Sequence, residues 1–423
     1  MNPETTPLEP ASQRSFFGLG IAPGILDILE RMKFTVPTPI QYKAIPIAVE
    51  GKDVMGIAQT GTGKTLAFGI PMVQRLAQGP GHAVVVVPTR ELALQVDETL
   101  RRLGDPLNIR TAVLIGGMNM NAQIHGLRKP STRILIATPG RLLDHLERRT
   151  VSLNDVKMAV LDEADRMLDM GFAPAIQKIA KCLPKERQTL FFSATMPESI
   201  LKLAAVYMKL PIRVEIARQG TAPEKIAQEL FIVKQEAKRQ LLAKLLEQYH
   251  GSVLIFSRTK AGARKTAIAI RQMNHTVNEI HANRSLPQRR EALEGFKTGR
   301  YRVLVATDIA ARGIDVKGIE LVINYDLPDD SENYVHRIGR TGRAGREGRA
   351  ITFATPDQGA DVRAIEQLIR GTLPIATHPS VPDEKFSSHP APKPNTKRHF
   401  FPGHRPSGGG QHSSFGGRRT FRR

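Results

Sequence analysis

The sequence predicts two tandem α/β domains, each built on a parallel β-sheet with helices on both faces, followed by a disordered basic tail. Short apolar runs alternate with segments of helical periodicity twice along the 423 residues, on either side of a polar, turn-rich stretch. This alternation of strands and helices is typical of parallel sheets. A hydrophobic content of 41% is enough for buried cores in both halves.

Each half contains a series of apolar runs of strand length. In the first half, the predicted strands are Asp53–Ile57, Ala83–Val87, Thr111–Ile115, Arg133–Ala137, Met158–Leu161 and Thr189–Phe192. Helical patterns such as Arg90–Leu103 and Arg141–Arg148 fill the gaps between them. In the second half, the predicted strands are Leu230–Val233, Val253–Phe256, Thr276–Ile280, Arg302–Ala306, Leu321–Asn324 and Ala350–Phe353.

Composition sets the domain boundaries. We predict an N-terminal extension over 1–15, a first domain over 16–217, a linker over 218–224 and a second domain over 225–376. Residues 377–423 are rich in Pro, Gly, Ser, His and Arg, with no acidic residue after Glu384, so this tail is predicted to be disordered. Aromatic residues among its cations, such as Phe386, suit stacking on unpaired bases. The alternative is a solubilising tail with no defined role.

The charge of the chain points to a polyanionic partner. The formal net charge is +21, which favours nucleic acid or an anionic membrane surface. The longest apolar run, Ala83–Val87, is far below the roughly 18 residues of a membrane-spanning helix, so no membrane partner is predicted. Cys182 is the single cysteine, which predicts a reducing cytoplasmic location and a small, buried apolar role for this residue.

A phosphate-binding loop is predicted where the first strand meets the next helix. It comprises Ala58, Gln59, Thr60, Gly61, Thr62, Gly63, Lys64 and Thr65. Gly61 and Gly63 let backbone N–H groups turn toward phosphate oxygens, and the helix beginning near Gly63 adds its positive end. Lys64 would bind the β and γ phosphates of a nucleoside triphosphate, and Thr65 would offer a hydroxyl to Mg²⁺. Ala58 departs from the strict pattern, which has glycine there.

Asp162 and Glu163 follow directly on the apolar strand Met158–Leu161. A carboxylate at the carboxyl end of a parallel strand faces the ligand crevice. Asp162 can reach Mg²⁺, and Glu163 can accept a proton from an attacking water. The alternative is an acidic turn that merely opens a helix.

Taken together and in order, these motifs resemble those of the DEAD-box RNA helicases, and the C-terminal half is similar to the bacterial RhlE-like branch. The similarity extends from about Phe16 to about Arg370. It implies two RecA-like domains that bind ATP and RNA across the cleft between them. Ala58 is a variant that this family shows at that position.

The resemblance implies roles for further residues of the nucleotide site. Phe34 would stack on adenine, Gln41 would read its edge, and Phe16 would pack behind them. Asp315 would contact the ribose, and Arg340 and Arg343 would act as arginine fingers on the γ-phosphate. The residues that would couple this site to domain closure are Ser193, Thr195 and His336.

The resemblance also implies an RNA surface that crosses both domains. In the first domain it would include Arg90, Gly116, Gly117, Thr138 and Arg141, and in the second Arg258, Arg289 and Thr307. Leu286 stands where the family usually has glutamine. Because leucine cannot make the hydrogen bonds of glutamine, we expect weaker RNA grip or interdomain coupling at that position.

The predicted function is that of an ATP-dependent RNA helicase, in which ATP and single-stranded RNA close the cleft and bend one strand of a local duplex. Its target would be a ribosomal precursor, a structured message or an RNA-decay complex. Two alternatives remain open. One is a DNA translocase built on the same pair of domains, and the other is an RNA annealing or assembly protein that uses ATP as a timer.

Overall fold

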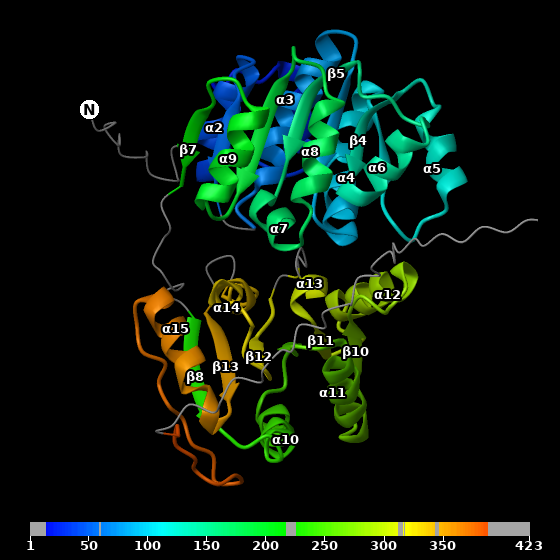
Figure 1. Ribbon diagram of the computed structural model, residues 1–423. Helices are drawn as coiled ribbons and strands as arrows, with labels where there is room; N and C mark the ends of the chain where they lie inside the picture. Colours follow the sequence, from blue (N-terminus) through cyan, green and yellow to red (C-terminus); the bar gives the residue numbers. More distant parts are fainter. Residues whose placement is uncertain are drawn as a thin grey trace, which may run out of the picture.

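The chain forms two α/β domains that lie one above the other (Figure 1). The computed structural model describes residues 14–58, 61–216, 226–311, 316, 318–342 and 347–387. The predicted linker at 218–224 and the tail beyond Ser387 lie outside these residues. Among the described helices, none is long and apolar enough to cross a membrane.

Domain 1 contains a seven-stranded sheet in the order β3-β4-β2-β5-β6-β1-β7, with every pairing parallel. Its strands are β1 (Val54–Ile57), β2 (His82–Val86), β3 (Arg110–Leu114), β4 (Thr132–Ala137), β5 (Val156–Leu161), β6 (Gln188–Ser193) and β7 (Ile212–Glu215). Its helices are α1 (Pro23–Arg31), α2 (Pro39–Val49), α3 (Lys64–Gln78), α4 (Arg90–Gly104), α5 (Met120–Leu127), α6 (Pro139–Glu147), α7 (Ala164–Asp169), α8 (Ala173–Lys181) and α9 (Glu198–Tyr207), with a 3₁₀ turn at Asp105–Leu107.

Domain 2 contains a six-stranded sheet in the order β10-β11-β9-β12-β13-β8, again with every pairing parallel. Its strands are β8 (Ile226–Ile232), β9 (Val253–Phe256), β10 (Val277–Ile280), β11 (Val303–Ala306), β12 (Leu321–Asn324) and β13 (Gly348–Ala354). Its helices are α10 (Lys238–Gln248), α11 (Lys260–Gln272), α12 (Leu286–Lys297), α13 (Asp308–Ala311), α14 (Ser331–Ile338) and α15 (Gly359–Ile369), with a 3₁₀ turn at Pro356–Gln358.

Alternate residues of each strand enter different cores, which confirms that helices cover both faces of the sheets. In β2, Val85 packs into the cluster beneath α2, α3 and α4, whereas Val84 and Val86 pack into the cluster beneath α6, α8 and α9. In β9, Ile255 and Leu254 divide in the same way between two of the three apolar clusters of domain 2.

The second domain extends beyond the predicted boundary at 376. A C-terminal strap (residues 371–387) follows α15 and packs against the domain. Leu230 of β8 exchanges backbone hydrogen bonds with Pro374 and Ala376, and Val381 enters the apolar core. Phe386, expected to be free for bases, packs instead near Gly359 at the start of α15. The prediction that disorder begins at Thr377 is therefore wrong for residues 377–387.

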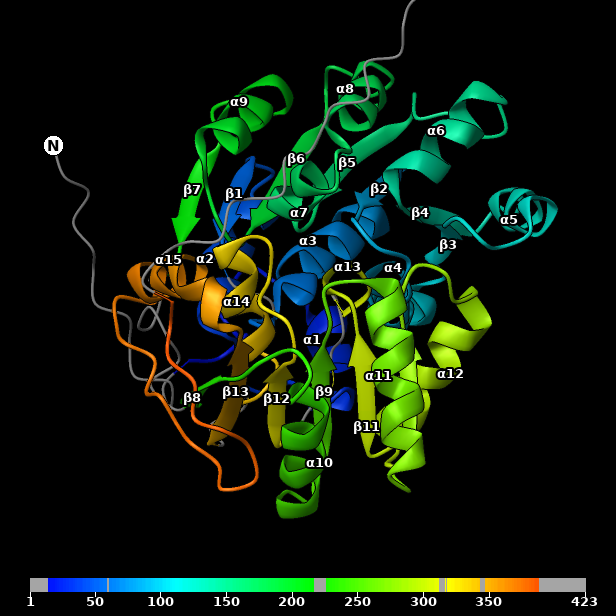
Figure 2. The same cartoon turned by 60° about the horizontal axis from the view of Figure 1, so that its bottom comes forward.

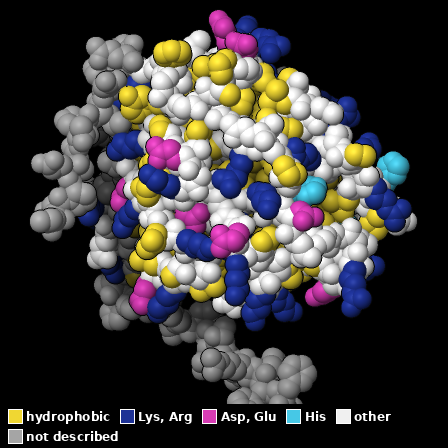
Figure 3. Space-filling model, turned by 90° about the horizontal axis from the view of Figure 1, so that it is seen from above, with side chains coloured by type: hydrophobic (Ala, Val, Ile, Leu, Met, Phe, Trp, Pro, Cys, Tyr) yellow, Lys and Arg dark blue, Asp and Glu magenta, His cyan; other side chains and the backbone are white. Residues whose placement is uncertain are grey.

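Two surface features also bear on the predictions. Cys182 is exposed rather than buried, because it caps the C-terminus of α8 on the solvent side. On the face of domain 1 that points away from domain 2, lysines and arginines are spread among acidic and apolar side chains (Figure 3). The part of that face formed by described residues carries no broad basic field.

The carboxyl ends of the strands place the predicted motifs. In domain 2, β9, β11 and β13 point toward domain 1 (Figure 2). Residues after β9 and β11 line a cavity together with Asp169 and Met170 at the end of α7. The motif-bearing edges of the two sheets therefore face one another, as expected for ligand binding at the carboxyl edge of parallel sheets.

Candidate nucleotide site and RNA groove

The phosphate loop has the backbone that its sequence predicts. Gly61 and Gly63 adopt φ values of 85° and 88°, and Gly63 is the N-cap of α3. A Cβ at Gly63 would lie 2.3 Å from the Gln41 side-chain nitrogen, so this position requires glycine for space as well as for conformation. Gln59 and Thr60 lie outside the described residues.

Gln41 braces this loop. Its side-chain N–H donates to the Gly63 carbonyl at 3.0 Å, and its Oε1 accepts from the Thr38 backbone N–H at 2.9 Å. The second contact completes a capping box at the start of α2. Phe34, the residue predicted to stack on adenine, is 39% exposed. Reading of adenine by Phe34 and Gln41 stays a prediction, but Gln41 already connects the start of α2 to the phosphate loop.

Lys64 and Asp162 lie close together beside the phosphate loop. The Lys64 ammonium donates to the Ala58 carbonyl at 3.1 Å and lies 3.8 Å from Asp162 Oδ1, and both side chains are buried. Burial raises the pKa of Asp162 to about 6, although Lys64 opposes the shift. A carboxylate desolvated to this degree favours a further cation beside it.

These residues fit Mg²⁺. Asp162 and the hydroxyl of Thr65, in the first turn of α3, offer hard oxygen ligands of the kind that Mg²⁺ prefers. No group of three or more His, Cys, Asp or Glu side chains arranged for a metal exists in the part of the chain that the structure describes.

Glu163 has a strained backbone. Its φ of 53° and ψ of 50° lie in the left-handed region, which a non-glycine residue adopts only uncommonly. The side chain is 2% exposed, and its Oε2 lies 3.6 Å from Arg166 Nε without a hydrogen bond to any described residue. This oxygen therefore keeps the capacity to accept a hydrogen bond, for example from a water molecule.

Asp165 is a site residue that was not predicted from the sequence, although it is the last residue of the motif Asp162-Glu163-Ala164-Asp165. Its Oδ2 accepts from the backbone N–H groups of Ala194 and Thr195 and from the Thr195 hydroxyl, at 2.9–3.1 Å. Its own N–H donates to the Ser193 hydroxyl at 3.3 Å. Burial opposes ionisation of Asp165, but Lys64 and these N–H groups outweigh it and hold its pKa below the usual value. The predicted coupling residues Ser193 and Thr195 are thus joined to the acidic motif.

Arg337 supports the opposite wall of the cleft. It is 1% exposed and binds both carboxylate oxygens of Asp308 at 2.5 and 2.7 Å, and it donates to the Asp326 carbonyl at 2.6 Å. These bonds fix α14 to α13. One turn later, Arg340 Nε donates to the His336 carbonyl at 3.3 Å. The other predicted finger, Arg343, and the predicted ribose contact, Asp315, lie outside the described residues.

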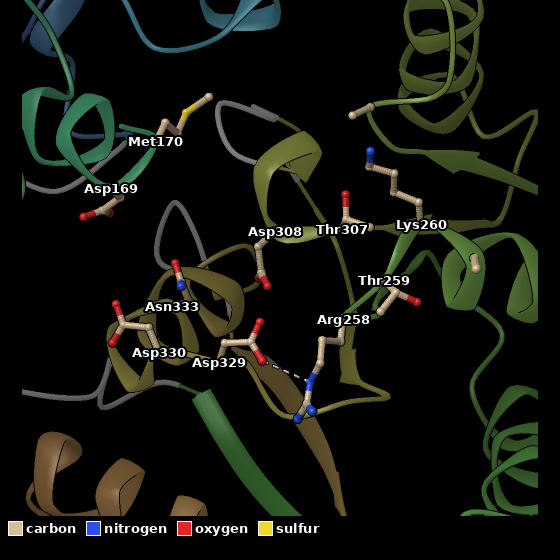
Figure 4. Close-up of a pocket in the computed structure, with 12 residues that line it drawn as sticks. Asp169, Met170, Arg258, Thr259, Lys260, Thr307, Asp308, Asp329, Asp330 and Asn333 are labelled. Carbon is tan, nitrogen blue, oxygen red and sulfur yellow. Dashed lines mark ion pairs between the residues drawn. The ribbon is translucent and has the colours of Figure 1, made fainter. Parts of the chain in front are cut away.

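Seven of the eight predicted RNA residues line two adjoining cavities. Arg90, Gly116, Thr138, Arg141 and Arg289 line the first, of about 400 Å³. Arg258 and Thr307 line the second, of about 730 Å³ (Figure 4). Met170 borders both, so together they form a groove that crosses from domain 1 to domain 2. Gly117, the eighth residue, packs against the Arg90 guanidinium, where a Cβ would come within 2.6 Å of Nη1.

A buried ion pair positions the domain 2 side of this groove. Lys238 is buried, and its ammonium lies 3.2 Å from Asp326 Oδ1. The other oxygen, Oδ2, accepts from the Ser257 hydroxyl at 3.0 Å and from the Arg258 backbone N–H at 3.1 Å. Lys238 was not foreseen, because a lysine in a helix normally reads as a solvated residue.

This arrangement is that of a two-domain nucleoside triphosphatase, in which a phosphate loop on one domain faces a second domain of similar topology. Residues 38–203 match the DEAD/DEAH box helicase family, and residues 237–345 match the helicase conserved C-terminal domain family. The ATP-dependent rRNA helicase RRP3 of Debaryomyces hansenii is 43% identical over 372 residues, covering 87% of this chain and 78% of the relative. The DEAD-box ATP-dependent RNA helicase CshA of Bacillus subtilis is 42% identical over 370 residues, covering 87% and 75%.

The chain belongs to the DEAD-box ATP-dependent RNA helicases, and its activity is accordingly RNA-dependent ATP hydrolysis. Both domains are RecA-like. The structure of S. cerevisiae Dbp5 bound to RNA and ADP BeF3 superposes with a TM-score of 0.77 at 31% identity, over 86% of this chain and 95% of that one. Mss116p bound to ssRNA and AMP-PNP gives 0.79 at 30% identity, over 89% and 82%. These relatives do not favour the DNA translocase or the annealing protein.

Proposed function

We propose that ATP is held by side chains from both domains and that RNA lies in the groove between them, so that each ligand promotes closure on the other. The observation that carries this proposal is the continuity of the groove, because the cavities that contain seven predicted RNA residues adjoin at Met170 across the two domains. Phosphate contacts of this kind carry little sequence preference. Closure on a bent strand would separate short duplexes locally.

Within the nucleotide site, Lys64 binds the phosphates and Arg340 and Arg343 act from domain 2 as arginine fingers. An arginine finger contributes about 10³–10⁵ in rate. Glu163 accepts a proton from the attacking water. Asp162 and Thr65 would hold Mg²⁺, which supplies charge neutralisation on the phosphates when it is bound. The remaining contacts are those predicted for Phe34, Gln41 and Asp315 at the adenosine.

The link from hydrolysis to closure runs through Asp165. Its carboxylate binds the backbone of Ala194 and Thr195, so a shift of the acidic motif during hydrolysis would move the loop after β6. His336 would report the same event in domain 2, because it shares α14 with Arg337 and precedes Arg340 by one turn.

We also propose an RNA target for this chain. Similarity to helicases named for rRNA supports a ribosomal precursor, with ribosome biogenesis as the setting. Membership of the bacterial RhlE-like branch rests on the motifs of the C-terminal half, and a cytoplasmic location rests on the single cysteine.

Replacement of Glu163 tests the proposed base. Glu163→Gln should keep affinity for ATP and for a single-stranded RNA, because the amide preserves shape, and should lower RNA-stimulated ATP turnover by about 10²–10⁴-fold. Turnover would be measured by phosphate release and RNA binding by fluorescence anisotropy. Glu198→Gln, an exposed substitution on α9, is the control. Near-normal turnover in Glu163→Gln would refute the assignment of Glu163 as base.

A further inference from the structure

The first turn of α12 is the place where domain 2 touches the RNA-binding loops of domain 1. Leu286, the first residue of α12, is 6% exposed although it lies at the rim of its own domain. It is buried in an apolar cluster whose other fully buried members all belong to domain 1. A Cβ at Gly117 would lie 3.9 Å from Leu286 Cβ, which is ordinary van der Waals contact. Leu286 therefore packs against the loop that carries Gly116 and Gly117.

A buried ion pair lies one turn further along the same helix. Arg289 Nη2 and Glu91 Oε2 are 2.8 Å apart, and both side chains are nearly inaccessible to solvent. The approach is close, but its angles do not make a hydrogen bond, and neither Glu91 oxygen has a hydrogen-bond donor among the described residues. Burial raises the pKa of Glu91 and lowers that of Arg289. Arg289, predicted as an RNA contact, is thus engaged with domain 1.

Both contacts of α12, those of Leu286 and Arg289, are made with residues beside the predicted RNA site. Glu91 follows Arg90 in sequence, and the Arg90 guanidinium lies against Gly116 and Gly117, within 3.1 Å of a Cβ built on either. One surface of the glycine loop thus faces an RNA-binding arginine and another faces Leu286. RNA that orders this loop also orders the surface on which Leu286 rests.

We propose that Leu286 is a positioning residue that couples RNA binding on domain 1 to domain closure through an apolar contact, with the Arg289–Glu91 pair fixing the register of that contact. Opening of the cleft exposes Leu286 to water, so its burial favours the closed state. RNA binds the closed state more tightly, so any contact that stabilises the closed state also raises the affinity for RNA. The leucine therefore strengthens interdomain coupling, contrary to the weakening expected from its sequence alone.

This inference rests on the proposed RNA role of the loops around Arg90, and Leu286→Gln tests it. The helix begins with a capping box between Ser285 and Gln288, which the substitution leaves intact. We expect the RNA concentration for half-maximal ATPase stimulation to rise about tenfold, as for loss of one buried leucine. Binding of ADP without RNA should not change, because the nucleotide loop lies on domain 1 and Leu286 on domain 2. The thermal unfolding midpoint should not change either, because Leu286 does not belong to the core of its own domain. Leu286→Met, which conserves volume, should behave as the parent protein.

Two further variants keep the test decisive. Ile268→Gln makes the same kind of change at a partly exposed residue on α11 of the same domain, and should leave the RNA dependence unchanged. Arg90→Ala should weaken RNA binding. If Arg90→Ala has no effect on RNA binding, the proposed RNA surface is wrong. If Arg90→Ala weakens binding while Leu286→Gln matches the parent protein, or if Ile268→Gln reproduces the loss, the coupling role of Leu286 is wrong.

Discussion

At the scale of single residues, buried charges do most of the positioning at the cleft. Lys238, Arg337 and Asp326 are held inside domain 2, where an isolated charge would be costly, and each has partners of opposite charge or polar backbone. Asp326 is the shared member. Its carboxylate holds Lys238 and the loop of Arg258, and its carbonyl accepts from Arg337. The loop of Arg258 and helix α14 therefore both depend on one aspartate.

Asp326→Asn should destabilise domain 2 by about 2–4 kcal/mol at pH 7, because it leaves Lys238 buried without its counter-ion. Burial opposes ionisation of Asp326, but Lys238 and the N–H and O–H donors around it hold its pKa below the usual value of 3.8. Stability supplied by the ionised form is therefore present above about pH 4 and lost as pH falls through the lower folded-state pKa.

Urea unfolding of Asp326→Asn and the parent protein at a series of pH values measures the stability that the charge of Asp326 supplies. The difference between their unfolding free energies should shrink below about pH 4. Asp329→Asn, a neighbouring exposed acid, should change stability by less than about 0.5 kcal/mol. A constant difference across the whole pH range would contradict the role of the Asp326 charge.

The residues that could be predicted are those whose chemistry appears in a local pattern. The phosphate loop and the acidic motif are contiguous, so Lys64, Asp162 and Glu163 could be named from the sequence. Lys238 and the Arg289–Glu91 pair could not, because each depends on segments far apart in the chain. Cys182 was predicted wrongly from residue type alone, since its position at the end of α8 decides its exposure.

At the scale of elements, the central strands and the edge strands β3 and β10 were predicted closely, whereas the edge strands β7 and β8 were missed or predicted only in part. β9 and β12 have the predicted bounds, because strands buried on both faces are continuous apolar runs. β7 was missed, since three of its four residues are exposed or partly exposed at the sheet edge. β8 begins earlier than predicted, at Ile226, because its first residues are polar on one face of an edge strand.

The C-terminal strap is an element with its own prediction. Removal of residues 371–423 should lower the unfolding free energy of domain 2 by about 3–6 kcal/mol, because Leu373 and Val381 lose their burial. Removal of residues 388–423 alone should leave stability unchanged and should reduce RNA affinity and its salt dependence, since this segment contains lysines and arginines but no acidic residue. Thermal unfolding and anisotropy at several salt concentrations would measure both. Equal unfolding free energies for the two truncated proteins would refute the proposed stabilisation of domain 2 by the C-terminal strap.

At the scale of the whole molecule, the order of the motifs predicted two domains, but the contact between them needed the structure. The groove, the Leu286 contact and the Arg289–Glu91 pair exist because the carboxyl edges of both sheets meet. We propose that nucleotide and RNA together set the spacing of the two domains.

Energy transfer between dyes on the two domains measures that spacing most directly. Cys182, exposed on domain 1, and Ala364→Cys, exposed on α15 of domain 2, provide the two attachment sites. We predict high transfer only when a non-hydrolysable ATP analogue and single-stranded RNA are both present, and loss of that state in Arg340→Ala. Transfer that is the same with and without the two ligands, or closure that persists in Arg340→Ala, would contradict the account.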